Sequence, residues 1–388
     1  MPCARDDLGW WSCEIRMKTS IERAALLKSL SHVQSVVERR NTIPILSNVL
    51  VEARERELRL TATDLDMEII ESLPADVIGV GGTTAPAHML YEIVRKLPDG
   101  AQVQLDGGEG DGRLTLKSGR SRFALSCLPR EDFPTLTAGD LPHRFALAPA
   151  DLTRLIDRTR FAISTEETRY YLNGIYLHAA ETGGKKTMRA VSTDGHRLAR
   201  VELPVPEGAG SMPGVIVPRK AVIELRRLLD DASEPVEIAL SENKIRFGFD
   251  SVVLTTKLID GTFPDYARVI PTGNDKVLRV DAKRFAESVD RVSTVATEKS
   301  RAVKLSLAEG RLTLTVINPE SGTAVEEIDA DYTAEPMEIG FNARYLLEIT
   351  AQIESPEVEF VFADSGSPTI VRDPEDTRAL FVLMPMRV

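Results

Sequence analysis

The sequence predicts an α+β fold of three similar domains, each made of two helices packed on antiparallel sheets. The first reason is a repeated motif, in which an alternating strand leads into Asp64, Asp194 or Asn318. These positions are 130 and 124 residues apart, which is too long for a solenoid repeat of about 20–50 residues and suits a copied domain. The second reason is the order of patterns around each motif: a helical period, alternating strands, a second helical period and more strands.

The length of the chain fits this division, because 388 residues accommodate three domains of the commonest size, about 100–150 residues. We place the domains at 17–141, 142–272 and 273–388, with linkers near 140–142 and 271–274. Residues 1–16 contain both tryptophans and two of the three cysteines without a clear period, so we expect a disordered N-terminal extension. The cysteine spacing fits no metal site or disulfide framework and favours a reducing cytosolic compartment.

Six segments have helical periodicity, which gives two helices per domain. Asp281 is expected to cap the leading helix of the third domain, and the second helices follow strands, behind Pro86, Pro218 and Asn342. We take the six segments as 18–40, 86–97, 151–161, 218–231, 281–304 and 342–353. Alternating strands are expected at 58–62, 113–116, 244–247 and 311–316.

Charge is distributed unevenly between these segments and the rest of the chain. The six helical segments carry +3, +1, +1, +1, +2 and 0, or +8 together, while the whole chain carries −11, which leaves −19 elsewhere. If the helices share one face, that face attracts a polyanion while the remaining surface repels it. The alternative is that the acidic loops are simply solvated.

Catalytic motifs are not found in the sequence, which has no nucleophile elbow, Walker loop, zinc-protease helix or Cys-x-x-Cys pair. The best enzymatic alternative is a hydrolase in which Asp194 orients His196 as a general base. An Asp-Gly turn explains the pair better, because the matching segment Asp64-Leu65-Asp66 has no histidine. Asp64, Asp66 and Glu68 could bind a metal, but a turn and a solvated strand edge are the simpler interpretation. We therefore expect no catalytic residue, no metal and no cofactor.

Ordered motifs throughout the chain resemble one known family. They include Val191-Ser192-Thr193-Asp194-Gly195-His196-Arg197-Leu198 and Asp260-Gly261-Thr262-Phe263-Pro264-Asp265-Tyr266. The others lie at 40–46, 118–123, 168–174, 215–220, 337–342 and 384–388. In this order and spacing, from Met17 to the C-terminus, the chain resembles the bacterial DNA polymerase III β subunit, the sliding clamp.

This resemblance implies the DNA-clamp fold and a head-to-tail homodimeric ring, with the helices lining the hole and the sheets forming the rim. Such a ring is a processivity factor that encircles double-stranded DNA without sequence specificity and slides along it. The chain would be a non-catalytic subunit of a DNA-directed DNA polymerase, a nucleotidyltransferase holoenzyme, in the cytoplasm at the nucleoid and away from membranes. The alternative within the same fold is a monomeric adaptor.

The resemblance also implies residues that meet DNA. Arg40, Arg169, Tyr170 and Tyr171 match family positions at the duplex, where arginine can contact phosphates and tyrosine can stack on bases or reach phosphates. Two alternatives stay open: Tyr171 could be a core residue, and Arg169 could pair with the neighbouring acids at 166 and 167.

A second implied site is a cleft between the second and third domains that accepts short linear peptides. Its implied partners are the replicative polymerase α subunit, the clamp loader, translesion polymerases, ligase and mismatch-repair proteins. The matching residues are Leu172, Thr193, Gly195, His196, Arg197, Leu198, Pro264, Arg268, Val269, Val382, Met384, Pro385, Met386 and Arg387. Methionines adapt to varied side chains, and we expect Arg197, Arg268 and Arg387 to hold polar or carboxylate groups at the rim. Val388 stands where the family often has leucine, which predicts a slightly smaller pocket edge.

Overall fold

The computed structural model forms two compact units, each of which is described by itself. The first unit comprises Met1–Pro149 and Ile223–Lys257, and the second Ala150–Val222 and Leu258–Val388. The residues that the structure describes are 4–5, 11–12, 16–39, 42–107, 112–137, 139–296 and 301–387.

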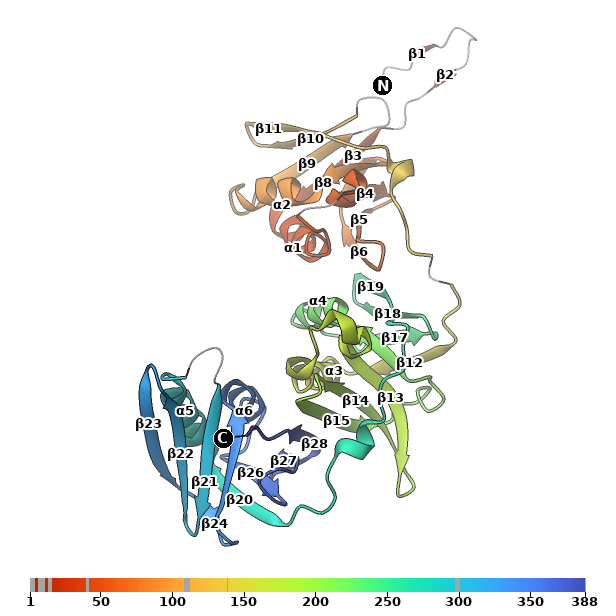
Figure 1. The fold of residues 1–388 in the computed structure, drawn as a ribbon. Coiled ribbons are helices and arrows are strands. Elements are labelled where there is room, and N and C mark those ends of the chain that lie inside the picture. Colours follow the sequence, from red (N-terminus) through yellow and green to blue (C-terminus); the bar gives the residue numbers. More distant parts are fainter. Residues whose placement is uncertain are drawn as a thin grey trace. The chain divides into compact units, whose positions relative to one another are not determined.

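One order of elements occurs three times along the chain (Figure 1). The first copy contains β3 (Met17–Glu22), α1 (Arg23–Val33), η1 (Pro44–Ser47), β4 (Asn48–Arg54), β5 (Glu57–Thr63), β6 (Met67–Pro74), β7 (Asp76–Gly79), β8 (Gly81–Pro86), α2 (Ala87–Arg95), β9 (Gln102–Gly107), β10 (Arg113–Ser118), β11 (Ser121–Ser126) and η2 (Arg130–Asp132). The second contains β12 (His143–Leu147), α3 (Pro149–Asp157), η3 (Arg160–Ala162), η4 (Glu167–Leu172), β13 (Gly174–Thr182), β14 (Lys185–Thr193), β15 (Arg197–Pro204), β16 (Val215–Pro218), α4 (Arg219–Leu229), β17 (Val236–Leu240), β18 (Lys244–Phe249), β19 (Val252–Lys257) and η5 (Tyr266–Val269). The third contains β20 (Lys276–Asp281), α5 (Ala282–Ser293), β21 (Ala302–Ala308), β22 (Arg311–Asn318), β23 (Gly322–Asp329), β24 (Asp331–Tyr332), β25 (Met337–Asn342), α6 (Ala343–Thr350), β26 (Glu357–Phe362), β27 (Thr369–Asp373) and β28 (Asp376–Leu383). Apart from the additional strands β7 and β24, each copy is thus two successive runs of a strand, a helix and three strands, which confirms the α+β fold of two helices on antiparallel sheets.

Antiparallel pairing builds every sheet of the described residues. The first unit has a sheet in the order β11-β10-β9-β3-β7 and another in the order β12-β17-β18-β19-β6-β5-β4-β8. The second unit has the orders β16-β13-β14-β15-β28-β27-β26-β20-β24 and β23-β22-β21-β25. The long sheets therefore run from one copy into the next, through β19 beside β6 and β28 beside β15. This continuity explains why the elements of the second copy are divided between the two compact units.

Helices cover these sheets with one apolar side. In the first copy α1 packs beside α2 and against β5 and β6, and in the third α5 packs beside α6 and against β22 and β23 (Figure 1). Asp281 caps α5 as expected, because its carboxylate accepts a hydrogen bond from the Arg284 amide at 2.7 Å. Phe285 and Val289 from the same helix are fully buried. No helix of the described residues is long and apolar enough to span a membrane.

Two ends of the predicted helical segments are strands in the structure. Residues 18–22 form strand β3 rather than the start of a helix, because they pair with β9 on one side and β7 on the other. Burial along β3 alternates with the period of two typical of a strand. Residues 302–304 likewise belong to β21, paired with β22 and β25. The predicted strands at 58–62, 113–116, 244–247 and 311–316 are all present.

The predicted domain boundaries at 141/142 and 272/273 fall between elements, after η2 and after η5, and they stay predictions. Within the N-terminal extension the structure describes Arg16 and a two-residue antiparallel pair, β1 (Ala4–Arg5) with β2 (Trp11–Ser12). Disorder elsewhere in that extension stays a prediction, since the remaining residues lie outside the described ones.

The motif that marks the three copies folds into the same turn each time. The side-chain oxygen of its first residue, Asp64, Asp194 or Asn318, accepts hydrogen bonds from the backbone amides two and three residues further along. The distances are 3.0 and 2.7 Å at Asp64, 2.9 and 3.0 Å at Asp194, and 2.9 and 3.4 Å at Asn318. A short side chain with a carbonyl-type oxygen suits this turn, so the structural interpretation of the repeated Asp is confirmed.

Replacing Asp64 by alanine should lower the free energy of unfolding by about 1–3 kcal/mol, because two backbone amides lose their acceptor. Asp64→Asn should cost much less, since asparagine makes the same turn at position 318. Urea unfolding followed by circular dichroism measures both variants. Equal losses for the two substitutions would show that charge, rather than the turn, is what the position provides.

Candidate functional site

The predicted partner-site residues come from four separate stretches of the second unit. They lie at the end of η4 and the turn into β15, along 264–269 around η5, and at the end of β28 with the residues that follow it. Of the other predicted site residues, Arg40 lies outside the described residues, as does Val388.

A buried apolar cluster joins these stretches. Leu172, Leu198 and Val382 are all buried and pack in one core cluster with Phe263 and Tyr266. The register of β15 and β28 places Leu198 directly opposite Val382. Residues that are more than 100 positions apart in the sequence therefore form one apolar floor.

The turn between β14 and β15 holds the next group of predicted residues. The Thr193 hydroxyl donates to the Arg197 carbonyl oxygen at 2.7 Å and accepts from the Gly195 amide at 3.1 Å. Gly195 has a φ of 87°, and a Cβ there would lie 2.6 Å from Nη1 of Arg169. The left-handed backbone favours glycine, although Leu65 adopts a φ of 79° at the equivalent position of the first copy. The turn leaves the His196 side chain exposed.

Arg197 differs from the expectation of a rim residue. Its side chain is only 6% exposed, and the guanidinium forms ion pairs with Asp194 and Glu348. The same group lies between two aromatic rings, 4.2 Å from the Tyr345 centroid and 5.1 Å from the Phe161 centroid. Arg197 therefore links the β14–β15 turn to α6 instead of offering a free charge to a ligand.

The other two arginines do lie at the surface. The Arg268 side chain is 84% exposed and pairs with Asp265 at 2.9 Å, and Arg387 is exposed. Pro264 and Val269, which are near Arg268 in the sequence, are exposed as well. The rim role thus remains a prediction for Arg268 and Arg387.

Backbone hydrogen bonds fix the segment after β28. The Met384 amide donates to the His196 carbonyl oxygen at 2.9 Å, and the Met386 amide donates to the Gly340 carbonyl oxygen at 2.8 Å. The Met384 and Met386 side chains are 39% and 38% exposed. Core packing, the default role for a methionine, does not describe either residue, and Pro385 between them is half-buried.

Three of the four expected DNA residues, Arg169, Tyr170 and Tyr171, lie on η4. Arg169 donates two hydrogen bonds to the Glu166 carboxylate, at 2.8 and 2.7 Å, so the pairing kept open from the sequence is present. Tyr170 is 54% exposed. Tyr171 is half-buried against the apolar cluster, which favours its core interpretation, and its ring meets the Tyr170 ring edge to face at 5.8 Å.

The enzymatic and metal alternatives find no support in this geometry. The Asp194 carboxylate binds the backbone amides of its own turn and the Arg197 guanidinium, while the His196 ring stacks on Tyr345 at 6.5 Å. In the first copy, Asp66 pairs with Lys257 at 2.9 Å, and Glu68 is buried, which raises its pKa. Among the described residues no cluster of histidine, cysteine and carboxylate side chains could hold a metal ion.

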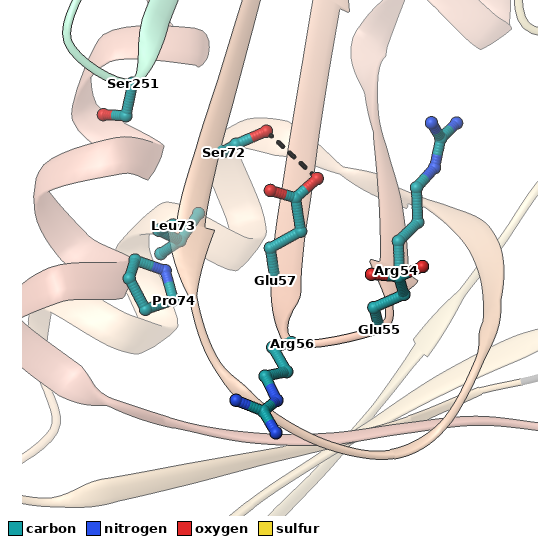
Figure 2. A pocket seen from close by; sticks show the side chains of 8 residues that line it. All are labelled: Arg54, Glu55, Arg56, Glu57, Ser72, Leu73, Pro74 and Ser251. Atoms are coloured by element: carbon teal, nitrogen blue, oxygen red, sulfur yellow. Dashed lines mark hydrogen bonds between the residues drawn. The ribbon is translucent and has the colours of Figure 1, made fainter.

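A separate hollow lies in the first unit, at the turn from β4 to β5. Figure 2 shows its lining, in which the Ser72 hydroxyl donates to Glu57 at 3.5 Å. The hollow has a volume of about 740 Å³ and is lined by Arg54, Glu55, Arg56, Glu57, Ser72, Leu73, Pro74 and Ser251. Arginine and glutamate alternate around it, so neither charge dominates, and it contains none of the predicted site residues.

Several residues of the site were missed in the sequence. Phe161, Tyr345 and Glu348 hold Arg197, and Tyr176 and His178 on β13 support the stretch around η5. Only the spacing of two between Tyr176 and His178, which places both side chains on one face of a strand, was visible in advance.

Arg197→Lys should lower the free energy of unfolding by about 2–4 kcal/mol, because an ammonium cannot bind two carboxylates and fill the space between two rings. Arg268→Lys is the matched control at an exposed pair, and we expect a change within about 0.5 kcal/mol. Differential scanning calorimetry measures both variants. A harmless Arg197→Lys would mean that the buried charge contributes little to the link with α6.

Comparison with known proteins gives a consistent result along the chain. Models of the DNA polymerase III beta subunit match its N-terminal domain at residues 17–137, its central domain at 146–265 and its C-terminal domain at 267–387. The beta sliding clamp of Caulobacter vibrioides is 59% identical over 372 residues, covering 96% of this chain and 100% of the relative. That of Escherichia coli K12 is 40% identical over 375 residues, with coverages of 96% and 100%.

Solved structures agree with these sequence matches. A beta sliding clamp of Caulobacter crescentus has a TM-score of 0.94 and 59% identity, covering 96% of this chain and 99% of that chain. A sliding clamp of Bartonella birtlesii bound to griselimycin has a TM-score of 0.94 and 50% identity, covering 96% of this chain and all of that one. With three domain models matched in order and relatives aligned over their full length, the chain belongs to the DNA polymerase III beta subunit family, the beta sliding clamps.

Proposed function

We propose that two copies of this chain close head to tail into a ring around duplex DNA and tether partner proteins to it. The observation that carries this proposal is the repeated pairing of strands between copies of the domain. In the first unit β6 pairs with β19, and in the second β15 pairs with β28. In both cases the outer strand of one copy's hairpin pairs with the last strand of the next copy.

The two strands left over from this rule are β11 and β23. β11 is the last strand of the first copy and β23 is the outer hairpin strand of the third, and each lies at the end of its sheet within the described residues. An exposed edge strand is a template for pairing with another chain. Pairing β23 of one chain with β11 of a second repeats the two internal junctions, and two such junctions close a ring.

The side chains of these edges are complementary. The hairpin of β10 and β11, residues 113–126, carries +4, whereas β23 carries −3 through Glu326, Glu327 and Asp329. Val325 on β23 is an apolar side chain that is 63% exposed. Opposite charges fix the register of such an interface, and burial of the apolar residue stabilises it.

The charge distribution supports DNA as the partner that is encircled. The observed helices α1 to α6 carry +5 together, so the rest of the chain carries −16. This segregation is weaker than the one expected from the longer predicted segments, but it has the same sign. A mildly basic inner surface attracts the duplex at about one charge per 1.7 Å without holding it in place, which suits sliding.

Among the predicted DNA residues, Tyr170 is the strongest candidate because its side chain is largely exposed. Arg169 would meet the duplex with part of its charge offset by Glu166. Arg40 stays a prediction, and Tyr171 would act mainly by packing behind Tyr170.

The four stretches around Leu172, Leu198, η5 and Val382 are proposed as the peptide site. An apolar floor, two half-exposed methionines and exposed arginines suit short segments that combine apolar and polar side chains. The proposed partners are the polymerase α subunit, the clamp loader, translesion polymerases, ligase and mismatch-repair proteins, and griselimycin is a proposed ligand. Since the family is a non-catalytic subunit, the chain acts by tethering, in the cytoplasm at the nucleoid.

After loading onto nicked circular plasmid by a clamp loader and ATP, the protein should stay bound through gel filtration at moderate salt. A single cut in the plasmid should release most of it, because a ring is retained by topology and not by affinity. Circular plasmid that is mock-treated without the restriction enzyme is the control. Retention on the cut plasmid, or light scattering that gives the mass of one chain at micromolar concentration, would favour the monomeric adaptor.

Deletion of residues 384–388 should weaken binding of a clamp-binding peptide at least tenfold, or about 1.4 kcal/mol, because two methionines and an arginine leave the site. The dimer should persist, since neither β11 nor β23 is touched. Fluorescence anisotropy measures the peptide affinity and light scattering measures the mass. Met89→Ala, at an exposed methionine on α2, is the control and should bind normally; an unchanged affinity of the deletion variant would remove this segment from the site.

A further inference from the structure

Two aromatic side chains attach the stretch 263–269 to strand β13. Phe263 stacks on Tyr176 with ring centroids 4.9 Å apart and planes 5° apart. The Tyr266 hydroxyl lies 3.0 Å from Nε2 of His178. Tyr176 and His178 are two residues apart on one face of β13 and stack on each other at 4.6 Å, so the four rings form one continuous support.

The hydrogen bonds around His178 determine its protonation state. Nδ1 lies 3.0 Å from the Ala179 carbonyl oxygen, which can only accept, so Nδ1 carries the proton. In a neutral ring Nε2 is then an acceptor, and it receives the Tyr266 hydroxyl proton. Nη1 of Arg189 lies 3.4 Å from the same hydroxyl oxygen and can only donate, so the hydroxyl accepts from Arg189 and donates to His178.

We propose that His178 positions the η5 side of the peptide site and makes partner binding weaken in acid. His178 contacts no ligand itself; it holds Tyr266, and Tyr266 and Phe263 in turn place Pro264, Arg268 and Val269 beside the apolar floor. This inference rests on the proposed peptide site, and it adds a supporting residue that the family resemblance did not supply.

The surroundings of His178 favour its neutral form. Burial lowers the pKa of His178, the hydrogen bond to the Ala179 carbonyl oxygen opposes this shift, and the positive charge of Arg189 on β14 also lowers the pKa. Glu202 on β15 pairs with Arg189 at 2.7 Å and so offsets part of that charge. The other titratable groups facing the ring are the hydroxyls of Tyr266 on η5 and Tyr176 on its own strand.

Protonation of His178 breaks this arrangement. Both ring nitrogens become donors, so the Tyr266 hydroxyl faces two donors and its own proton loses its acceptor. Because the folded-state pKa lies below the ordinary value of 6.5, the neutral support is complete above that value. It is lost as the pH falls through the lowered folded-state pKa, which loosens η5 and one side of the peptide site.

The test is the affinity of a blocked, uncharged pentapeptide of leucine, phenylalanine, glutamine and serine, labelled with tetramethylrhodamine, from pH 7.5 to 4.5. We expect the wild type to lose about tenfold in affinity, or about 1.4 kcal/mol. His178→Gln keeps an acceptor for the Tyr266 hydroxyl but does not titrate, so it should bind as the wild type does at pH 7.5 and lose much less in acid. Tyr266→Phe should bind several-fold more weakly at pH 7.5, with the remaining pH dependence reduced.

His196→Gln is the matched control, because it makes the same substitution at a second histidine, which lies in the proposed site itself. That variant should keep the pH dependence of the wild type, whatever its effect on affinity. Transfer of the pH dependence to His196, or an undiminished dependence in His178→Gln, would overturn the proposal.

A second readout does not depend on peptide binding. In ¹⁵N-histidine NMR at pH 7.5, the His178 ring should show a protonated Nδ1 and an unprotonated Nε2. The opposite tautomer would overturn the positioning role even if peptide binds. The expected tautomer in a protein that binds no peptide would instead show that the proposed peptide site has failed, and the acid response of binding with it.

Discussion

The rest of the structure depends on one constraint: the outer strand of a β-hairpin must find a second neighbour for its backbone groups. Each of the three copies presents such a hairpin, and within the chain β6 and β15 are completed by the last strand of the following copy. The same rule leaves β23 and β11 at sheet edges. A protein with long edges of this kind either pairs them or risks aggregation, so closure is a structural need before it is a function.

Joining copies through continuous sheets also decides where a partner site can form. A junction brings the turn of one copy's hairpin next to the end of another copy's last strand. At the second junction the turn at 193–197 meets the segment after β28, and η4 and η5 supply the remaining sides. The proposed site therefore draws on two copies: the second supplies most of the apolar floor, and the third supplies Val382 and the segment after β28.

Local signals were predictable from the sequence. The Asp64 and Asp194 turns and the Asp281 cap depend on hydrogen bonds within three residues, and they were identified correctly. Residues 18–22 were assigned to a helix because their strand character comes from pairing with β9, which begins 80 residues after residue 22.

The predicted role of Arg197 as a rim residue was wrong for a similar reason. Its partners Phe161 and Glu348 lie far away in the sequence on either side, and neither is marked by a local pattern. The family resemblance indicated which residues belong to the proposed site, but not how buried they are or what they contact. It grouped a buried arginine with two exposed ones, and it omitted His178, which is connected to the proposed site through Tyr266 and Tyr176.

The two junctions within the chain show how one backbone arrangement can serve two purposes. In the first, the Lys257 amide donates to the Asp66 carbonyl oxygen at 2.8 Å, and the two side chains form an ion pair at 2.9 Å. In the second, the Met384 amide makes the equivalent bond to His196 at 2.9 Å, but the side chains there are a half-exposed methionine and an exposed imidazole. A surface ion pair is satisfied by itself and offers little to a ligand, whereas methionine and histidine leave apolar surface to be covered. The sheet junction is thus the common element, and its side chains differ: an ion pair covers the first junction, whereas a methionine and an imidazole remain at the surface of the second.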